Sequence, residues 1–596
     1  MFNKMPVNLI RRSETKLSEG YSEIMRDLEE RLAACERGGR IVIDGTNGAD
    51  FNRFAAELEN ALAALGDRTT RIAVQRFLRT DDKLRQRFAG DITDNRAFGR
   101  MTEGGLEDFF RADARAACEE EILQARVSNC SEREWVIVAG VGAYFLTGGG
   151  QLNVFLDLSR ETQQTLHKGE LNNFGFQSAE DALEKYKIAF FVEWPVLEQY
   201  RKRHLREFDV YADMNDGTWP IAVGADALVE MIAELAEGPM RVKPFFAPGV
   251  WGGQYLKKLA DLPGDWENCA WSFEPIAPEN SILLGVGGNV IDVPFMLVMN
   301  LSFEAILGGR VSALFGDFFP IRFDYLDTIG GTNLSVQVHP KQAYVEENFN
   351  YILEQQESYY IMEKKEGSKV YLGLTDECEK TEFLGAVEEA QDTGNGIDHT
   401  LYVKEWECEK GDLFLIPTGT VHCSGNDNLV LEISSTPWWF TFKIYDYVRP
   451  GMDGKPRPIN IDHAKANIDW HKKPDWVKRE LIGVPTLAGR QGASEEYRLG
   501  YRDDLLFYVN RIHLAEAEVW EEDTQGEMLM FNLVEGERVR IEPLSNWSAA
   551  VELGYAESYI LPAALGKFRI VNIGGTPAKL IKAGVSPQWD IRVVHE

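Results

Sequence analysis

The chain is poor in cysteine and in positive charge, and it has no long apolar run. Seven cysteines are scattered over 596 residues without a Cys-x-x-Cys pair. This argues against a disulfide framework and against a cysteine zinc site. No apolar stretch reaches the length that spans a membrane, and the first residues carry no secretory signal core. We therefore expect a cytoplasmic protein.

Basic residues are strongly outnumbered, with 63 Lys and Arg against 94 Asp and Glu and a net charge of −31. An acidic surface repels nucleic acid and anionic membranes, so we expect neither as a main partner. A sugar or sugar-phosphate substrate stays compatible, because its site needs only a local cluster of Lys or Arg. The length predicts two to four domains, and the composition leaves homo-oligomerisation open.

One segment alternates polar and apolar side chains in an informative way. Ser335, Gln337 and His339 alternate with apolar residues, so on a strand these three lie on one face. Gln oxygen and His nitrogen both bind divalent metals. A second histidine, His422, follows a short apolar strand and a Pro-Thr-Gly-Thr turn. Such strand–turn–strand units bring distant ligands together in a small barrel.

These segments read L-S-V-Q-V-H-P at 334–340 and G-D-L-F-L-I-P-T-G-T-V-H at 411–422. They resemble the type I mannose-6-phosphate isomerases (phosphomannose isomerases), which are zinc-dependent cupins. Val-Trp-Gly-Gly at 250–253 is also similar to the family, and the likeness covers about residues 241–596. It implies all-β double-stranded β-helix (cupin) domains: a metal-binding catalytic domain at 249–470 and a second, metal-free cupin-like domain at 471–596. Short strands separated by Gly, Pro and Asn after residue 500 agree with the second barrel.

The resemblance also implies a ligand set and a reaction. The ligands are Gln337, His339, Glu357 and His422, which suit Zn²⁺, with another divalent transition metal as the alternative. The implied reaction is that of an aldose–ketose isomerase, an intramolecular oxidoreductase that moves a proton between C2 and C1 through an enediol.

The resemblance assigns the catalytic groups as well. Glu432 matches the family's catalytic Glu and is the expected base. Lys443 stands where the family has an Arg that stabilises the enediolate, and Arg449 matches a basic residue six positions on. The change from Arg to Lys replaces a bidentate donor by a point charge.

The phosphate pocket is the part of the site where this chain differs most from the family pattern. Ser335 matches a phosphate-binding Ser, but two Lys of the family are Gln355 and Asp324 here. Arg322, on the same strand face as Asp324, and Lys341 are the expected replacements. Charge-assisted bonds are the strong ones, so this loss weakens binding of a dianion.

Residues 1–217 read as an α/β domain. The apolar strand Ile41–Ile43, a Gly loop and a helix resemble the opening of P-loop nucleoside kinases of the uridine-kinase type. Counted from Gly45, the P-loop pattern G-x-x-x-x-G-K-[ST] ends here in Asp50, Phe51 and Asn52. We therefore predict a degenerate P-loop-kinase-like fold without phosphoryl transfer. It serves as a docking or oligomerisation domain, or as a nucleotide or sugar-phosphate sensor.

Residues 218–248 are predicted to be a connector, and the acidic segment 362–404 a solvated insertion rather than a lid.

The leading hypothesis is interconversion of mannose 6-phosphate and fructose 6-phosphate. Two alternatives stay open: the same chemistry on an unphosphorylated or other sugar, and a non-catalytic metallocupin sugar sensor. A working kinase–isomerase fusion is disfavoured by residues 50–52.

Overall fold

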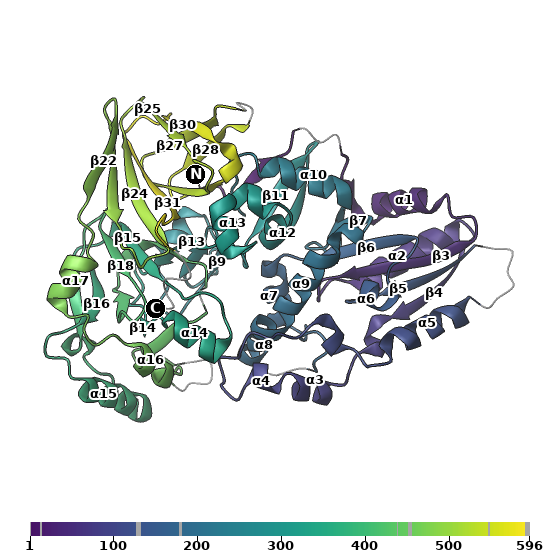
Figure 1. Ribbon diagram of the computed structural model, residues 1–596, viewed down its shortest axis with the longest axis horizontal. Helices are drawn as coiled ribbons and strands as arrows, with labels where there is room; N and C mark the ends of the chain where they lie inside the picture. Colours follow the sequence, from purple (N-terminus) through teal and green to yellow (C-terminus); the bar gives the residue numbers. More distant parts are fainter. Residues whose placement is uncertain are drawn as a thin grey trace. The chain divides into compact units, whose positions relative to one another are not determined.

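The computed structural model describes residues 2–11, 15–126, 133–177, 181–437, 439–450, 456–545 and 549–589. The chain divides into two compact units (Figure 1). The α/β unit comprises Val7–Leu235 and Ser281–Leu301, and the β unit comprises Met1–Pro6, Ala236–Asn280 and Ser302–Glu596. The predicted multi-domain organisation with a β-rich second part is confirmed.

The α/β unit is built on a seven-stranded sheet with the order β2-β8-β7-β6-β3-β5-β4. The five strands from β3 to β7 run parallel. The strands of this sheet are β2 (Ser18–Glu19), β3 (Gly38–Gly45), β4 (Arg68–Ala73), β5 (Glu134–Ala139), β6 (Leu152–Asp157), β7 (Val210–Asp213) and β8 (Ile221–Gly224). A separate three-stranded sheet of the unit contains β1 (Val7–Leu9), β11 (Ser281–Val286) and β12 (Asn289–Pro294).

Helices lie on both faces of this sheet, with α1 and α2 on one and α5 on the other (Figure 1). The central strands are therefore buried on two sides, which explains the apolar runs Ile41–Ile43 in β3 and Trp135–Ala139 in β5. The helices are α1 (Gly20–Leu32), α2 (Phe51–Ala64), α3 (Asp81–Arg87), α4 (Ala89–Ile92), α5 (Ala114–Ala125), α6 (Ala143–Thr147), α7 (Arg160–Lys168), α8 (Ala182–Ile188), α9 (Trp194–His204) and α10 (Ala225–Leu235).

Two segments depart from the predicted boundaries. Residues 218–248 were predicted as a connector, but β8 pairs with β7 and α10 follows it, so both belong to the α/β unit. Residues 281–301 fall inside the predicted catalytic domain, 249–470. In the structure β11 from this segment pairs with β1 and β12, and the segment returns to the α/β unit. These pairings join residues far apart in sequence, and local patterns do not report them.

The β unit contains two pairs of antiparallel sheets. One pair has the orders β18-β15-β20-β13-β10-β9 and β17-β16-β19-β14-β21, and we call it the first barrel. Its strands are β9 (Phe245–Ala247), β10 (Trp271–Phe273), β13 (Ile321–Asp327), β14 (Val336–Val338), β15 (Glu357–Lys364), β16 (Lys369–Leu374), β17 (Val403–Glu407), β18 (Leu413–Ile416), β19 (His422–Ser424), β20 (Asn428–Ser435) and β21 (Phe442–Tyr445).

The other pair, the second barrel, has the orders β22-β23-β24-β31-β26-β29 and β25-β30-β27-β28. A core that includes Phe531, Phe568 and Leu580 fills it. Its strands are β22 (Thr486–Gln491), β23 (Ser494–Gly500), β24 (Phe507–Leu514), β25 (Val519–Asp523), β26 (Leu529–Glu535), β27 (Arg538–Pro543), β28 (Val551–Gly554), β29 (Ser558–Leu561), β30 (Lys567–Asn572) and β31 (Ala578–Val585).

Helices of the β unit connect and flank these strands. They are α11 (Tyr255–Leu259), α13 (Gly309–Phe315), α14 (Gln342–Phe349), α15 (Lys380–Thr393), α16 (Ile461–Asn467) and α17 (Pro474–Glu480), and α12 (Phe295–Leu307) begins in one unit and ends in the other. The prediction of a solvated insertion over 362–404 is wrong for β16, which is largely buried and pairs directly with β19. None of the helices in the described part of the chain combines the length and apolarity needed to cross a membrane.

Candidate metal centre and active site

Neighbouring strands of the first barrel bring the predicted ligands to one place. Gln337 on β14 pairs with His422 on β19, and on its other side with Lys443 on β21. Directly paired residues of antiparallel strands point to the same face, so these three side chains form a row. His339 follows the end of β14, and Glu357 begins β15 in the other sheet.

The two imidazoles converge on the Glu357 carboxylate. His339 Nε2 lies 2.9 Å from Glu357 Oε1, and His422 Nε2 lies 3.2 Å from Glu357 Oε2. These three residues offer ligand atoms that all lie within 4.8 Å of one another. Gln337 Nε2 is 3.3 Å from His422 Nε2. All four side chains are buried, and the spacing suits a single metal ion.

Backbone carbonyls fix the orientation of both imidazoles. His422 Nδ1 is 2.8 Å from the Thr420 carbonyl oxygen, and His339 Nδ1 is 3.4 Å from that of Phe440. A carbonyl only accepts hydrogen bonds, so each Nδ1 carries the proton and each Nε2 presents its lone pair inward. Metal-ligating histidines are held in this way in proteins.

Two unpaired polar atoms indicate that these side chains could hold a metal ion. His339 Nε2 and Glu357 Oε2 are buried and lack a hydrogen-bond partner. Burying unpaired polar atoms is costly, and a bound cation would satisfy both. Gln337 Oε1 accepts from Ser335 Oγ at 3.2 Å, so Gln337 becomes an oxygen ligand when its amide turns over. Two imidazoles, a carboxylate and an amide oxygen suit Zn²⁺ or a similar divalent ion.

The protonation states of Glu357 and His339 at neutral pH are those needed to bind a metal ion. Burial by itself raises the pKa of Glu357, but the adjacent His339 and His422 hold it well below its usual range. Burial lowers the pKa of His339, against the attraction of Glu357. The carboxylate is therefore ionised and His339 neutral, which is the form in which each binds metal.

A second cluster of charges lies directly beside the metal ligands. Arg322 and Asp324 on β13 pair with Ser434 and Glu432 on β20. Arg322 donates to Glu432 Oε1 and to Ser434 Oγ, the latter at 2.6 Å. It also lies 3.4 Å from both Glu357 Oε1 and Asp324 Oδ1. One buried guanidinium therefore serves three carboxylates.

This arrangement argues against the predicted role of Arg322. It was expected to replace a lost Lys at the substrate phosphate, but its residue exposure is only 4% and its donors are used by carboxylates. Burial raises the pKa of Asp324 to about 7, although Arg322 opposes this. Burial likewise raises the pKa of Glu432 well above its usual value. The wall beside the metal ligands is thus rich in carboxylates.

A cationic cluster gathers around the end of β21. Arg449 Nη1 and Arg457 Nη1 lie 3.2 Å and 3.0 Å from the two carboxylate oxygens of Asp446. Burial, followed by the repulsion of Arg457, lowers the pKa of Lys443 to about 8. Arg449 also donates to the Asn333 carbonyl, just before the 334–340 segment. This cluster places positive charge next to the row formed by Gln337 and His422.

Lys341 lies apart from these groups. It is exposed and lines a cavity of about 460 Å³ together with Lys472 and Arg502, and none of the four predicted metal ligands lines that cavity. Ser335, in contrast, is buried and bonds to Gln337. The structure therefore brings together all the predicted site residues except Lys341, with Arg322 present in a different role.

Sequence reasoning missed Tyr359 and Arg457. Tyr359 pairs with Glu432, its ring centroid is 5.9 Å from that of His422, and its buried hydroxyl has no partner. It lies two residues after Glu357 on the same strand face, so simple alternation could have found it. Arg457 carried no such signal.

The chain is similar in its C-terminal part to mannose-6-phosphate isomerases. The mannose-6-phosphate isomerase ManA of Bacillus subtilis is 26% identical over 342 residues, which is 56% of this chain and 95% of the relative. The putative mannose-6-phosphate isomerase YvyI of the same organism is 25% identical over 347 residues, 56% of this chain and 96% of the relative. The predicted resemblance of this part is confirmed.

Two solved structures also match this part of the chain. The mannose 6-phosphate isomerase of Bacillus subtilis matches with a TM-score of 0.47 and 21% identity, over 58% of this chain and 100% of that chain. A putative mannosephosphate isomerase from Archaeoglobus fulgidus matches with a TM-score of 0.45 and 17% identity, over 59% and 99%. Residues 20–237 match a domain of unknown function, DUF8485. The kinase-like assignment of the N-terminal part stays a prediction.

Replacing His339 by Ala should remove the bound metal, because it deletes one of two imidazoles from a small buried site. Metal content per chain, measured by mass spectrometry after dialysis, checks this. The matched control is His471→Ala, at an exposed histidine away from the ligands, which should keep its metal. Full metal content in His339→Ala would show that the ion is held elsewhere.

Proposed function

We propose that the chain is a metal-dependent aldose–ketose isomerase that interconverts mannose 6-phosphate and fructose 6-phosphate through an enediol. The observation that carries this proposal is the convergence of His339, Glu357 and His422 beside the buried acid Glu432. The similarity of the C-terminal part to mannose-6-phosphate isomerases supports a sugar isomerase.

A metal held by Gln337, His339, Glu357 and His422 would supply Lewis-acid stabilisation of the negative charge that develops on the substrate oxygens. The protein's own contribution starts with Glu432. Arg322 and Ser434 both bond to its Oε1, which leaves Oε2 to accept and return the substrate proton. A raised pKa brings a carboxyl group closer to the working pH, which favours general acid–base catalysis.

Lys443 has the complementary role. It stands across from Gln337 on the neighbouring strand, and its ammonium group supplies positive charge near the enediolate oxygens. A pKa of about 8 keeps it mostly protonated at neutral pH. Burial of Glu432 and of the four metal ligands limits the access of water to the reactive intermediate.

We propose that the cationic cluster around the end of β21 binds the substrate phosphate. Gln355 and Asp324 replace the two family Lys, and Arg322 is committed to carboxylates. Arg449 and Arg457 both pair with the single carboxylate of Asp446, so this side of β21 keeps positive charge that can bind a phosphate. Ser335 would add a neutral hydrogen-bond donor.

An unphosphorylated sugar is the second candidate, and one observation favours it. Asp324 brings a third carboxylate beside Glu357 and Glu432, where the family has a Lys. Added negative charge at this wall disfavours a dianion and suits the hydroxyl groups of a neutral sugar.

For the α/β unit we propose a kinase-like fold that performs no phosphoryl transfer. The order β4-β5-β3-β6-β7 of its parallel strands supports the likeness to P-loop kinases. Asp50 Oδ1 accepts from the Arg53 amide at 2.9 Å, so a carboxylate already caps α2 where a phosphate would sit. Among the residues that the structure describes, no Lys or Arg lines the cavity of about 710 Å³ at this end of the sheet.

Substrate choice is tested by assaying the metal-loaded protein on mannose 6-phosphate and on free mannose. We expect turnover of the phosphate ester. We also expect Arg449→Ala to raise the KM for mannose 6-phosphate roughly 10- to 100-fold, because the variant loses one charge-assisted bond to the phosphate. Arg479→Ala, at an exposed arginine on α17, is the control. Turnover of free mannose alone would establish the second candidate, and no turnover of either by metal-loaded protein would contradict both.

Changing Glu432 to Gln should lower kcat by about 10²–10⁴-fold while the metal is retained, because it removes the proton acceptor but keeps the side-chain shape. Steady-state kinetics with parallel metal analysis measures this. Glu366→Gln, in an exposed turn, should behave like the wild type. An unchanged kcat in Glu432→Gln would place the base elsewhere.

The pH profile tests Lys443. Its folded pKa lies below the ordinary lysine value, so the cation is lost as the pH rises through about 8. We expect kcat/KM to decline above that pH. In Lys443→Arg the decline should move to higher pH, since a guanidinium stays protonated. Superimposable alkaline limbs for the two proteins would show that Lys443 does not control activity.

A further inference from the structure

The interior of the second barrel changes character along its strands. On β24 the core residues Ile512 and Leu514 share a face with Asn510 and Tyr508, which lie two and four positions before Ile512 respectively. On β31 the core residue Leu580 shares a face with Lys582 and Gly584. The same sheet face is therefore apolar at one end of the barrel and polar at the other.

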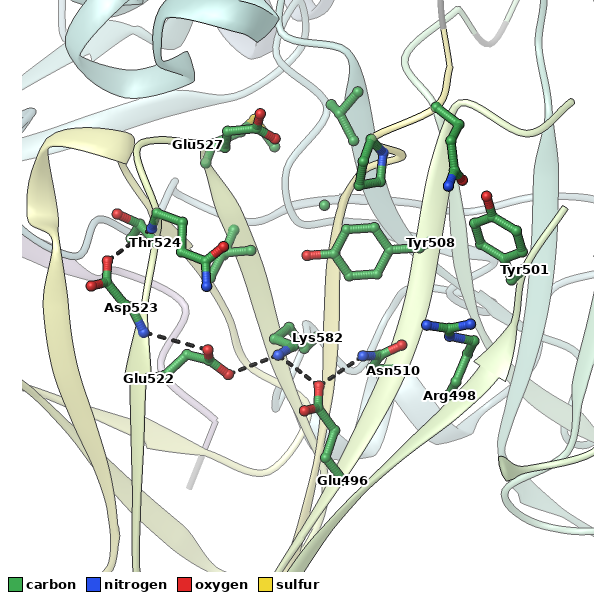
Figure 2. Close-up of a pocket in the computed structure, with 17 residues that line it drawn as sticks. Glu496, Arg498, Tyr501, Tyr508, Asn510, Glu522, Asp523, Thr524, Glu527 and Lys582 are labelled. Carbon is green, nitrogen blue, oxygen red and sulfur yellow. Dashed lines mark hydrogen bonds and ion pairs between the residues drawn. The ribbon is translucent and has the colours of Figure 1, made fainter. Parts of the chain in front are cut away.

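A cavity of about 720 Å³ lies at the polar end (Figure 2). Its volume falls in the range of small-molecule sites, and the mouths of β-barrels are common places for such sites. The side chains that line it include Glu496, Arg498, Tyr508, Asn510, Glu522 and Lys582.

One buried lysine and two partly buried glutamates lie together in the lining of this cavity (Figure 2). Lys582 Nζ is 2.6 Å from Glu496 Oε1 and 2.7 Å from Glu522 Oε2. Their side chains are 9%, 13% and 17% exposed, in that order. Buried ion pairs are poor stabilisers compared with apolar packing, so their presence inside a barrel calls for another explanation. Binding of a polar ligand supplies one.

An unsatisfied acceptor adjoins these charges. Asn510 Nδ2 donates to Glu496 Oε1 at 2.7 Å, which fixes the amide, but Asn510 Oδ1 is buried without a partner. Buried polar atoms in proteins are rarely left unpaired. A ligand hydroxyl in the cavity would satisfy this oxygen.

Tyr508 gives the cavity a flat aromatic wall. It pairs with Gly584, and a Cβ at Gly584 would come within 2.7 Å of the Tyr508 hydroxyl oxygen. Glycine is therefore what lets the ring lie across the neighbouring strand. The hydroxyl points into the cavity (Figure 2). Burial raises the pKa of Tyr508 to about 12, so the hydroxyl stays a hydrogen-bond donor.

We propose that this cavity binds an uncharged monosaccharide or its polyol, at a site separate from the metal centre. Carboxylate and amide oxygens of Glu496, Glu522 and Asn510 accept from hydroxyl groups, and Lys582 and Tyr508 donate to them. The Tyr508 ring packs against the C–H groups of the ligand.

The charge around the cavity selects for a neutral ligand. Four acidic residues line it against two basic ones, the acids being Glu496, Glu522, Asp523 and Glu527 and the bases Arg498 and Lys582. Outside the lining, Arg310 neutralises Glu527 at 2.5 Å. The remaining excess of negative charge disfavours phosphate esters.

Isothermal titration of the full chain with D-mannitol tests the proposal, because mannitol has no carbonyl group to isomerise. We expect saturable binding that survives chelation of metal, since none of the metal ligands lines the cavity. Asn510→Leu keeps the side-chain size but removes the hydrogen bonds, and Tyr508→Ala removes the aromatic wall. Each should weaken binding at least tenfold.

The control variant is Lys579→Met on the same strand, β31. Lys579 pairs with Glu535 at 3.0 Å and lies outside the cavity lining, so its loss should leave mannitol binding unchanged. Absence of saturable binding to the wild type would overturn the proposal. Equal binding by the wild type and Asn510→Leu, or tighter binding of mannose 6-phosphate than of mannitol to the metal-free protein, would overturn it as well.

Discussion

The sharing of one buried carboxylate, Glu357, organises the first barrel. Its oxygens meet both imidazoles, and Oε1 also accepts from Gln355 Nε2 at 2.5 Å and lies 3.4 Å from Arg322. Glu357 therefore joins the metal ligands to the carboxylate–arginine cluster. Removing one partner of a buried charge network typically costs about 3–5 kcal/mol, so these groups fold and function as a unit.

The two sheets of this barrel contribute different chemistry. The six-stranded sheet supplies the carboxylates Glu357, Asp324 and Glu432, while the five-stranded sheet supplies Gln337, His422 and Lys443. In the proposed mechanism, the first sheet carries the group that transfers the proton and the second carries the groups that stabilise the oxyanion. A substrate between them would meet acceptors on one side and a cation on the other. The second barrel repeats the sandwich but places an ion triad and Tyr508 at its polar end instead of imidazoles.

Alternation along a single strand pointed to part of the candidate site. It put Ser335, Gln337 and His339 on one face, and the turn before His422 marked the second imidazole. The pairing of Arg322 with buried carboxylates could not be predicted in this way. It depends on the strand register, which places Arg322 opposite Ser434 and Asp324 opposite Glu432, more than 100 residues away in sequence. The return of residues 281–301 to the α/β unit and the burial of β16 are long-range in the same sense.

We propose that one metal ion is held between the two imidazoles and Glu357. Anomalous diffraction from crystals grown with Zn²⁺ tests it most directly. We expect a single strong peak about 2.0–2.2 Å from His339 Nε2, His422 Nε2 and a Glu357 oxygen, with the Gln337 amide turned to present its oxygen. The absence of a peak there, with the Glu357 carboxylate still lying between the two rings, would contradict it.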